Sequence, residues 1–482
     1  MNELEAFCES HYERVNVISD PVYGYVPFTK RPDKPGITET AEEDLIDSDW
    51  VQRLRRIHQL QAAWWVFPSG EHTRFQHSLG TMHLAGGFAR HLYESLQAVC
   101  ERDIPSQVKV VETARVAGLL HDIGHGPFGH FFDDYYLRRW GITHETVGQE
   151  IIMGPLRQLI ESIRRSTEDD FKLGEQLRAE DIAYLIKKPE QGNEKQANER
   201  WLSLLRAIFT GIYTADSLDY VTRDAYMTGV CLDPVDIDRL IYYTHFRQSD
   251  GNCLMTLHLH GIGALQRFLQ ARFYMYDNVY CHRTVRAIEL DMRDIFEATI
   301  DKLLKRNPIE DLESYLALDE WSLISMVSEW SKQASNTLEQ GWKRIIERKP
   351  RWHRIFERRH QLVRRDPMTR IWTEDELQRA IYSKLPSYVR EKLRLDDIRV
   401  DIASFHPRPE NPYRGEYAME IYDPVTRKTV TEHWDRILME IPARAFIVRV
   451  FALSEEYAQE IYQAATEVLS ADRTQEDFPS NI

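Results

Sequence analysis

Residues 119–133 read LLHDIGHGPFGHFFD and continue an apolar, helix-forming run. Five side chains in this stretch can bind metal: His121, Asp122, His125, His130 and Asp133. A helix that turns its apolar face to the core can end in the His-Asp pair, so that both side chains project into one cleft. Imidazole nitrogens and carboxylate oxygens are ligands for divalent cations such as Mn, Fe, Zn or Mg. The stretch therefore predicts a metal site at the end of a buried helix.

Two ligands do not complete a metal site, so partners must come from other helices. His77 ends the motif TRFQH, and Asp216 lies in the motif ADSLDYVTRD. With His121 and Asp122 they give the pattern H…HD…D, and we predict these four residues as the metal ligands. The alternative is a glycine-rich helix end with incidental histidines. That alternative leaves three histidines and two aspartates within thirteen residues unexplained.

The composition indicates a soluble, globular, multidomain protein. The chain has 482 residues, with 43% hydrophobic and 28% charged side chains. Its net charge of −15 argues against broad electrostatic attachment to nucleic acid or anionic membrane. Five scattered cysteines without a CxxC pair suggest reduced thiols. Because the N-terminus lacks a signal-peptide pattern and no run of about 18 apolar residues occurs, we expect a cytoplasmic protein.

The hydrophobic pattern predicts a mainly α fold. Residues 14–27 alternate β-branched and aromatic residues, which indicates one or two short strands with a turn. After residue 396 the hydrophobic pattern becomes strand-like. The predicted parts are 1–42 (β element and loop), 43–305 (helical core with the site), 306–395 (helical extension) and 396–482 (small α+β domain). Helices are predicted near 43–63, 75–98, 107–121, 144–164, 179–186, 201–229, 234–243, 261–305 and 320–346. Strands are predicted at 397–405, 417–423 and 445–453, and a helix at 453–469.

The basic run at 347–366, ERKPRWHRIFERRHQLVRRD, is interpreted as a solvated helix face, with a nucleotide or nucleic-acid contact as the alternative.

On the helix that contains Asp216, spacing of four residues places Tyr220 and Asp224 on the same face, whereas Asp219 is expected at the surface.

Four further residues, Arg272, Tyr276, Tyr280 and Arg283, have helical spacing and are predicted on one helix. An aromatic stripe at this spacing is usually a core feature. Arginines at both ends favour another interpretation, because the planar guanidinium binds phosphate oxygens in a bidentate manner. The tyrosines can stack on a nucleoside or hydrogen-bond to it.

These groups suit phosphoester hydrolysis. A bound cation polarises a phosphoryl oxygen and lowers the pKa of bound water. Arginines neutralise charge that grows in the transition state. A histidine can protonate the leaving oxygen, and the candidates for this donor and its orienting partners are His130, Asp133 and His144. The sequence contains nothing that resembles a Ser or Cys triad, a Walker loop or a GxGxxG motif.

Seven motifs occur in the order seen in the dNTP triphosphohydrolase branch of the HD-domain phosphohydrolase superfamily. They are DPVYGYV, QRLRRIHQL, FPSGEHTRFQHSLG, HDIGHGPFGHFFD, THE, ADSLDYVTRD and YCHRTV. The chain resembles this branch from about residue 20 to about residue 290. The resemblance implies an HD-domain helical core and cleavage of a dNTP to a deoxynucleoside and tripolyphosphate.

The resemblance also implies roles for individual residues. The metal ligands would be His77, His121, Asp122 and Asp216. Residues around the α-phosphate that handle protons would be Arg74, His125, His130, Asp133 and His144. Sugar and phosphate contacts would come from Gln59, Leu60, Tyr220, Asp224, Arg272 and Tyr280. A regulatory guanine nucleotide between subunits of a homo-oligomer would bind at Asp47, Gln52 and Arg55.

Two positions depart from the pattern of this branch. Ser217 stands where the closest relatives have a phosphate-binding lysine, and Gln61 stands where glycine is usual. One cation fewer beside the phosphates would weaken triphosphate binding or shift the preference to another phosphoester. Besides the dNTP triphosphohydrolase, two alternatives therefore remain: another HD phosphohydrolase (a nucleotidase or cyclic-nucleotide phosphodiesterase), and a module that senses nucleotide without turnover.

Overall fold

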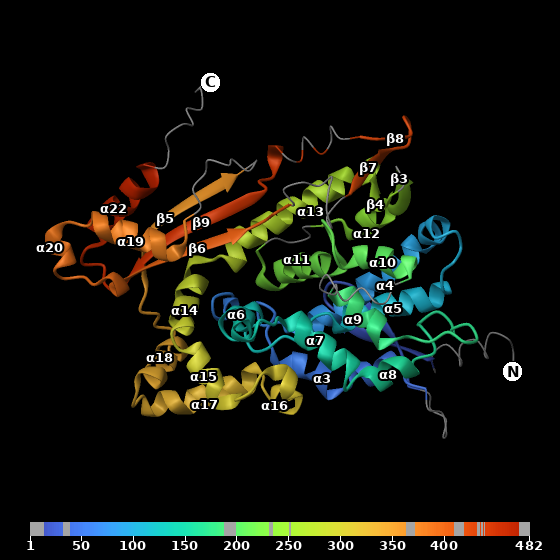
Figure 1. The fold of residues 1–482 in the computed structure, drawn as a ribbon, viewed down its shortest axis with the longest axis horizontal. Helices are drawn as coiled ribbons and strands as arrows, with labels where there is room; N and C mark the ends of the chain where they lie inside the picture. The colour runs from blue at the N-terminus through green and yellow to red at the C-terminus, as the bar shows by residue number, and fades with distance from the viewer. Residues whose placement is uncertain are drawn as a thin grey trace. The chain divides into compact units, whose positions relative to one another are not determined.

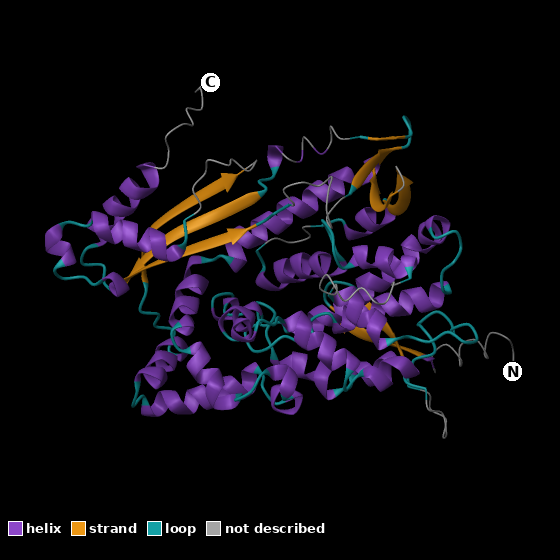
Figure 2. Ribbon diagram, viewed as in Figure 1, coloured by secondary structure: helices purple, strands orange, loops and turns teal. Residues whose placement is uncertain are grey.

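The computed structural model describes residues 14–31, 39–187, 199–230, 235–249, 252–362, 372–408, 419–430 and 439–471, together with Trp434 and Ile437. The chain divides into two compact units. The first consists of Met1–Met275, Phe296–Val327 and Asn411–Asp435, and the second of Tyr276–Ile295, Ser328–Glu410 and Arg436–Ile482. Helices predominate, as the sequence predicts (Figure 2). The predicted four-part division remains a prediction.

The first unit begins with an antiparallel hairpin of β1 (Val15–Asp20) and β2 (Gly24–Thr29), which confirms the predicted short strands. Asp20 closes its turn, because the carboxylate accepts the backbone N–H groups of Val22 and Tyr23. None of the described helices combines the length and the apolar character that crossing a membrane requires.

Two long helices, α4 (Arg74–Val99) and α5 (Gln107–Leu120), form the centre of the first unit. Most of their residues are buried, and α11 (Ala215–Thr228) contacts α4. Further helices in this part of the chain are α2 (Glu42–Ile46), α3 (Asp49–Arg53), α6 (His130–Tyr135), α7 (His144–Met153), α8 (Arg157–Ser162), α9 (Ala179–Ile186), α10 (Arg200–Leu205), α12 (Ile237–Tyr242), α13 (Ile262–Met275), α15 (Phe296–Leu303), α16 (Leu312–Leu316) and α17 (Glu320–Gln333) (Figure 1).

Several predicted long helices are divided in the structure. The predicted helix at 144–164 forms α7 and α8, because Pro155 lacks an N–H and disfavours helical geometry at Gly154. The predicted helix at 201–229 forms α10 and α11, with a break that contains Gly211. The predicted helix at 43–63 is replaced by α2, α3 and 3₁₀ turns.

A four-stranded sheet completes the first unit. The hairpin of β3 (Thr244–Ser249) and β4 (Asn252–His258) was not predicted from the sequence. Strand β7 (Glu420–Asp423) pairs in parallel with β4, and β8 (Lys428–Thr429) pairs with β7. The part of the predicted strand at 417–423 that the structure describes contains β7, which belongs to this sheet and not to the C-terminal α+β fold; residues 417 and 418 lie outside the described residues.

The second unit contains a three-stranded antiparallel sheet in the order β5 (His353–Leu362), β9 (Arg444–Ala452), β6 (Ile398–Phe405). Strands β6 and β9 confirm two of the predictions. The predicted helix face at 347–366 is wrong, because this stretch contains strand β5 and Phe356 is buried. The arginines hide the two-residue period of the strand in the sequence. Residues 363–366 lie outside the described residues. The helices of this unit include α14 (Arg283–Arg293), α18 (Thr337–Ile346), α19 (Glu374–Lys384), α20 (Ser387–Arg390) and α22 (Ala458–Ala471).

The prediction of one helix for Arg272, Tyr276, Tyr280 and Arg283 is wrong. Helix α13 ends at Met275, a π-helical turn spans Tyr276–Tyr280, and α14 begins at Arg283. Arg272 therefore lies in the first unit, whereas Tyr280 lies in the second.

Candidate metal centre and its cavity

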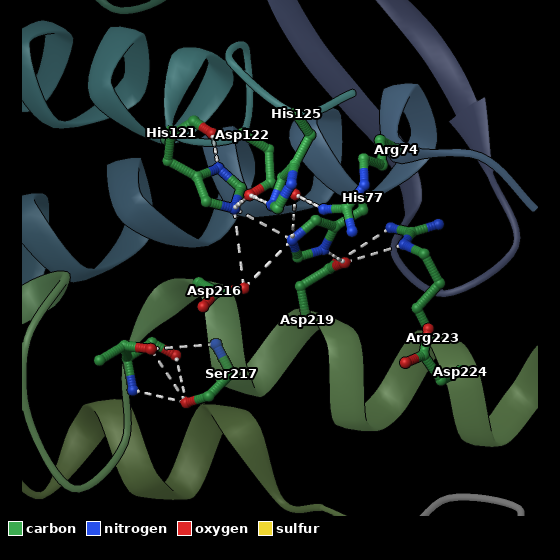
Figure 3. Close-up of polar contacts among 12 residues, drawn as sticks. Arg74, His77, His121, Asp122, His125, Asp216, Ser217, Asp219, Arg223 and Asp224 are labelled. Atoms are coloured by element: carbon green, nitrogen blue, oxygen red, sulfur yellow. Dashed lines mark hydrogen bonds and ion pairs between the residues drawn. The ribbon is translucent and has the colours of Figure 1, made fainter. Parts of the chain in front are cut away.

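Three helices bring the predicted metal ligands together (Figure 3). His77 is in the first turn of α4, where Gln76 caps the backbone N–H of Thr73 at 2.9 Å. His121 is the C-terminal cap of α5, and Asp216 is in the first turn of α11. The Nε2 atom of His77 lies 3.1 Å from that of His121 and 3.1 Å from Asp216 Oδ1.

Further distances connect His121 to both aspartates and Asp122 to His77. The Nε2 atom of His121 lies 3.6 Å from Asp216 Oδ1 and 3.4 Å from Asp122 Oδ1. The second oxygen of Asp122 lies 3.8 Å from His77 Nε2. Ligand atoms that share a cation at about 2.1 Å are separated by roughly 3.0 to 3.4 Å in tetrahedral or octahedral geometry. His77, His121 and Asp216 therefore form a group that fits a divalent cation of the type that imidazole and carboxylate ligands bind, whereas Asp122, which lies beside this group, stays a predicted fourth ligand.

The tautomers of both histidines suit this role. His121 donates from Nδ1 to the carbonyl oxygen of Gly118 at 2.9 Å. His77 donates from Nδ1 to Asp219 Oδ2 at 2.7 Å. In each neutral ring the Nε2 lone pair is then directed to the centre of the group, and the acceptor on Nδ1 fixes the orientation of the ring. Burial lowers the pKa of His77, but hydrogen bonds to Asp216 and Asp219 outweigh it and raise the pKa to about 10, so a bound cation would have to displace a proton from Nε2.

Asp219 is the most important residue that the sequence analysis missed. It was expected at the surface, but its side chain is completely buried. Its carboxylate accepts two hydrogen bonds from Arg223, both at 2.9 Å, and one from the Tyr23 hydroxyl at 2.8 Å, in addition to the bond from His77. Burial raises the pKa of Asp219, but Arg223 and His77 lower it to about 2. The Asp-Arg spacing of four residues was the available signal.

We expect Asp219→Asn to weaken metal binding by about 10-fold to 100-fold, as for other residues that orient metal-bound histidines. The amide of asparagine places a donor beside the donors of His77 and Arg223, so the His77 ring loses its fixed orientation. Titration calorimetry with Mn²⁺ measures the affinity. Asp238→Asn, at an exposed site on α12, is the matched control. Equal affinities in both variants would show that Asp219 does not support the site.

A buried arginine network holds the loop that follows α5. Arg74 donates to Asp122 Oδ2 from Nη1, and its side chain is only 4% exposed. Within the described part of the chain, Arg74 Nε has no hydrogen-bond partner. Arg53, which is completely buried, donates to the carbonyl oxygen of His125 at 2.7 Å. Both guanidinium groups therefore fix the backbone and the carboxylate of the HDIGH segment.

A second cluster lies next to the metal group: His125, His130, Asp133 and His144, whose ligand atoms all lie within 4.8 Å of one another. Asp133 Oδ2 accepts from His144 Nδ1 and lies 3.6 Å from His130 Nδ1. The rings of His125 and His144 stack with centroids 3.6 Å apart. His125 Nε2 lies 3.4 Å from Asp122 Oδ1, which links the two clusters.

The two stacked histidines have opposite electrostatic environments. Burial lowers the pKa of His144, but the hydrogen bond and charge of Asp133 outweigh it and raise the pKa. Burial, with the charges of Arg74 and His144, holds the pKa of His125 well below its usual range. The pKa values of the two stacked rings are therefore shifted in opposite directions, as in sites where one group acts as an acid and a neighbour does not.

A cavity of about 460 Å³ adjoins both clusters. Asp216 lines it on the side of the metal group. Glu145 lines it too, and its Oε1 lies 3.7 Å from His144 Nε2. Three basic side chains also line it: Lys187, Arg206 and Arg272. A ligand in this cavity therefore meets Asp216 of the metal group, Glu145 next to His144, and three basic side chains.

The structure distributes the predicted substrate residues unevenly. Tyr220 and Arg272 line the cavity, but Gln59, Leu60 and Asp224 are not among the lining residues. Asp224 is 2% exposed and accepts from His72 Nε2 at 2.7 Å. Their predicted sugar contacts, and that of Tyr280 in the second unit, remain predictions. Nothing in the sequence identified Lys187 or Arg206 as cavity residues. Lys187 lies next to a polar loop, and Arg206 lies in an ordinary helical pattern.

Gln61 and Ser217 are the two departures from the resemblance. Gln61 has φ of 51°, a left-handed conformation that favours glycine. Ser217 is buried, and its hydroxyl and backbone N–H bond to Thr214 in a capping box at the start of α11. Ser217 therefore stabilises the helix end next to Asp216 and supplies no charge.

The predicted regulatory residues lie in the segment from the end of α2 to the 3₁₀ turn Leu54–Arg56 that follows α3. Asp47 is the C-terminal cap of α2. Gln52 accepts from Arg55 Nε at 2.8 Å, and the Arg55 guanidinium lies 3.6 Å from the centre of the Phe75 ring. Asp47 and Arg55 are exposed. A nucleotide site here remains a prediction.

Comparison with known proteins agrees with this geometry. Residues 74–195 match the HD domain, and residues 235–397 match an HD associated region. An uncharacterised protein of Methanocaldococcus jannaschii is 31% identical over 286 residues, which cover 59% of this chain and 51% of the relative. The deoxynucleoside triphosphate triphosphohydrolase SAMHD1 of Gallus gallus is 29% identical over 328 residues, 63% of this chain and 50% of the relative. The SAMHD1 homolog of Dictyostelium discoideum is 24% identical over 431 residues, which cover 88% of this chain and 77% of the relative.

The chain thus spans about half the length of the Methanocaldococcus and chicken relatives. The HD match begins at the residue where α4 begins and includes His77, His121 and Asp122. The chain thus contains an HD domain followed by an HD associated region.

Proposed function

We propose that this protein is a metal-dependent deoxynucleoside triphosphate triphosphohydrolase that releases a deoxynucleoside and tripolyphosphate. One observation carries the proposal: a single cavity with three basic residues is bounded by Asp216 of the metal group and by Glu145, which adjoins His144. The names of the chicken and Dictyostelium relatives support the choice of substrate. The reaction breaks the bond between the α-phosphorus and the 5′-oxygen of the nucleoside.

The cation held by His77, His121, Asp122 and Asp216 would polarise the α-phosphoryl group and lower the pKa of an attacking water. The protein's own side chains transfer the proton and neutralise the charge on the phosphates. Asp133 holds the proton of His144 at Nδ1, so that Nε2–H can protonate the departing 5′-oxygen. His130, which is 62% exposed at its side chain, also contacts Asp133 and supplies a route for proton exchange with solvent. Arg272 neutralises charge on the phosphates in the transition state.

A nucleotidase is the second candidate, because the uncharged Ser217 is adjacent to the metal-group residue Asp216. Separate incubations of each dNTP and each dNMP with Mn²⁺ or Mg²⁺, with and without GTP, distinguish the possibilities. Tripolyphosphate and deoxynucleoside in equal amounts support the proposal. Inorganic phosphate released from dNMPs instead would support the nucleotidase. Binding of dGTP without any product would indicate a sensor of nucleotides.

The same experiment tests regulation. We propose that Asp47, Gln52 and Arg55 bind a guanine nucleotide between copies of the chain. The exposure of Asp47, which follows α2, and of Arg55, in the 3₁₀ turn after α3, supports this. Stimulation of turnover by GTP, with a rise in the molar mass measured by light scattering, is the expected result. A turnover rate and a molar mass that do not change when GTP is added would contradict a regulatory site.

We expect Arg272→Ala to reduce kcat/KM for a dNTP by at least tenfold, since a charge-assisted hydrogen bond contributes about 1.5 to 3 kcal/mol. Steady-state kinetics measures the change, and thermal unfolding should differ little. Arg267→Ala is the matched control on the same helix, because Arg267 is exposed and outside the cavity lining. Unchanged kinetics for Arg272→Ala would remove this residue from the phosphate site.

A further inference from the structure

The turn between β1 and β2 contains the motif DPVYG, to which the proposed reaction gives no role. Asp20 begins this turn, and its charged side chain is only 6% exposed. One of its oxygens, Oδ1, accepts from the backbone N–H groups of Val22 and Tyr23 at 2.9 and 3.0 Å. The other, Oδ2, accepts from Arg223 Nη1 at 2.7 Å. A single carboxylate therefore fixes the turn and joins it to α11.

Arg223 connects this contact to Asp219, which lies one helical turn earlier on α11. Its Nε and Nη2 atoms donate to the two oxygens of Asp219, both at 2.9 Å (Figure 3). Its third nitrogen, Nη1, donates to Asp20, and the side chain is 1% exposed. Because each nitrogen of the planar guanidinium has a carboxylate acceptor, the turn and α11 together fix its orientation.

Tyr23 provides a second link from the turn to the same carboxylate. Its hydroxyl donates to Asp219 Oδ1 at 2.8 Å, and the centre of its ring lies 5.1 Å from that of the His83 ring on α4. Burial and the charge of Asp219 raise the pKa of Tyr23 well above its usual value, so the hydroxyl keeps its proton and donates. With the bonds from Arg223 and His77, hydrogen bonds occupy about all the lone-pair sites of the Asp219 carboxylate.

We infer that Asp20 and Tyr23 are positioning residues for the metal group, because they fix the carboxylate that orients His77. A carboxylate that is free to rotate accepts from the imidazole in several ring orientations, whereas the fully bonded Asp219 accepts in one. Groups that orient a metal-binding histidine in this way strengthen metal binding. The inference goes beyond the proposed function, since it holds for any substrate that the metal group acts on.

Binding of Mn²⁺ to the metal-free full-length protein, measured by titration calorimetry, tests this inference. In Asp20→Asn the amide oxygen still accepts from the turn, but the amide nitrogen presents a donor to Arg223. We expect this variant to bind Mn²⁺ about tenfold more weakly, as for other residues that orient metal ligands. Tyr23→Phe keeps the ring and removes one donor, so we expect a weakening of about threefold to tenfold.

Two exposed residues supply matched controls. Tyr25→Phe makes the same change on the same hairpin, at a side chain that is 65% exposed. Asp238→Asn makes the same change as Asp20→Asn at an exposed position of α12. Both controls should bind Mn²⁺ with the affinity of the wild type.

A double-mutant cycle separates a positioning role from a structural one. If Asp20 acts through Asp219, Asp20→Asn should change the Mn²⁺ affinity of an Asp219→Asn variant by less than about twofold. A turn that only stabilised the fold would lower the unfolding temperature and leave the affinity of the folded protein unchanged. The visible absorption of the Co²⁺-loaded protein, which depends on ligand geometry, should shift in Asp20→Asn and Tyr23→Phe and stay unchanged in the controls.

Equal Mn²⁺ affinity in Asp20→Asn, Tyr23→Phe and their controls would overturn the inference, as would wild-type protein that binds no Mn²⁺. A loss of affinity from Asp20→Asn that is equally large in the Asp219→Asn background would also overturn it, because the effect would not pass through Asp219. Tyr23→Phe alters no backbone contact and decides the question if Asp20→Asn does not fold. A protein that binds Mn²⁺ as expected but releases no tripolyphosphate would contradict the proposed reaction and keep the positioning role.

Discussion

Replacement of His121 and Asp122 by alanine together is expected to abolish metal binding and turnover while helix content stays near wild type. The two residues supply one imidazole and one carboxylate to the metal group, and His121 Nε2 lies within 3.6 Å of the acceptors in both aspartates. The remaining pair, His77 and Asp216, offers too few ligands for a divalent cation. The helices stay intact because α5 buries its other residues independently of the metal.

Metal content after dialysis and circular dichroism test this expectation directly. In the wild type, Mn²⁺ at 100 times its Kd should stabilise the fold by about 2.7 kcal/mol, and the variant should show no such shift. The loss of Asp122 also leaves the buried Arg74 without its carboxylate, so the metal-free variant should unfold at a lower temperature. His260→Ala with Asp238→Ala removes the same residue types from exposed positions and is the control. Full turnover in the His121 and Asp122 variant would refute the site.

The grouping of His77, His121 and Asp216 was predictable because its signals are local. A capping box begins α4 at Thr73 and places His77 in its first turn, and a second box at Thr214 does the same for Asp216. An apolar run that ends in a polar pair places His121 at the end of α5. Each signal is contained within about ten residues, so a single sequence reveals it.

What could not be predicted depends on contacts between distant segments. Asp219 reads as an ordinary surface acid until the hairpin contributes Tyr23 and α4 contributes His77. Gly80 shows the same dependence: a Cβ there would lie 1.9 Å from Asp219 Oδ1, so α4 and α11 approach closely only because the residue is glycine. Strand β5 was mistaken for a helix because its partner, β9, lies about 90 residues away in the sequence.

The cavity cations illustrate a further limit. Lys187 follows α9 and Arg206 follows α10, and neither position has a periodic or motif signal that distinguishes it from a solvated basic residue. Their common feature is the wall that they share with Asp216, which only the tertiary structure reveals. The substrate class was therefore the least predictable property of this chain, whereas the metal site was the most predictable.

Gly124, within the HDIGH segment, provides the second large expected effect. A Cβ at this position would lie 2.0 Å from the carbonyl oxygen of His144 and 2.5 Å from the backbone nitrogen of Gly148. Both are backbone atoms of α7, so no change of rotamer relieves the contact. Gly124→Ala is therefore expected to displace α7 and to lower the free energy of unfolding by about 3 kcal/mol or more.

The same displacement should separate His144 from Asp133 and so impair proton transfer even in the fraction that folds. Denaturant unfolding gives the stability, and the pH dependence of kcat reports the protonated histidine. Gly87→Ala on α4 is the matched control, because a Cβ there meets nothing within 4 Å; it should stabilise the protein by up to about 1 kcal/mol through helix propensity. Equal stability of the two variants would contradict the close approach. Gly124 therefore serves the second cluster, because it lets α7 approach closely enough to place His144 beside the candidate metal ligands.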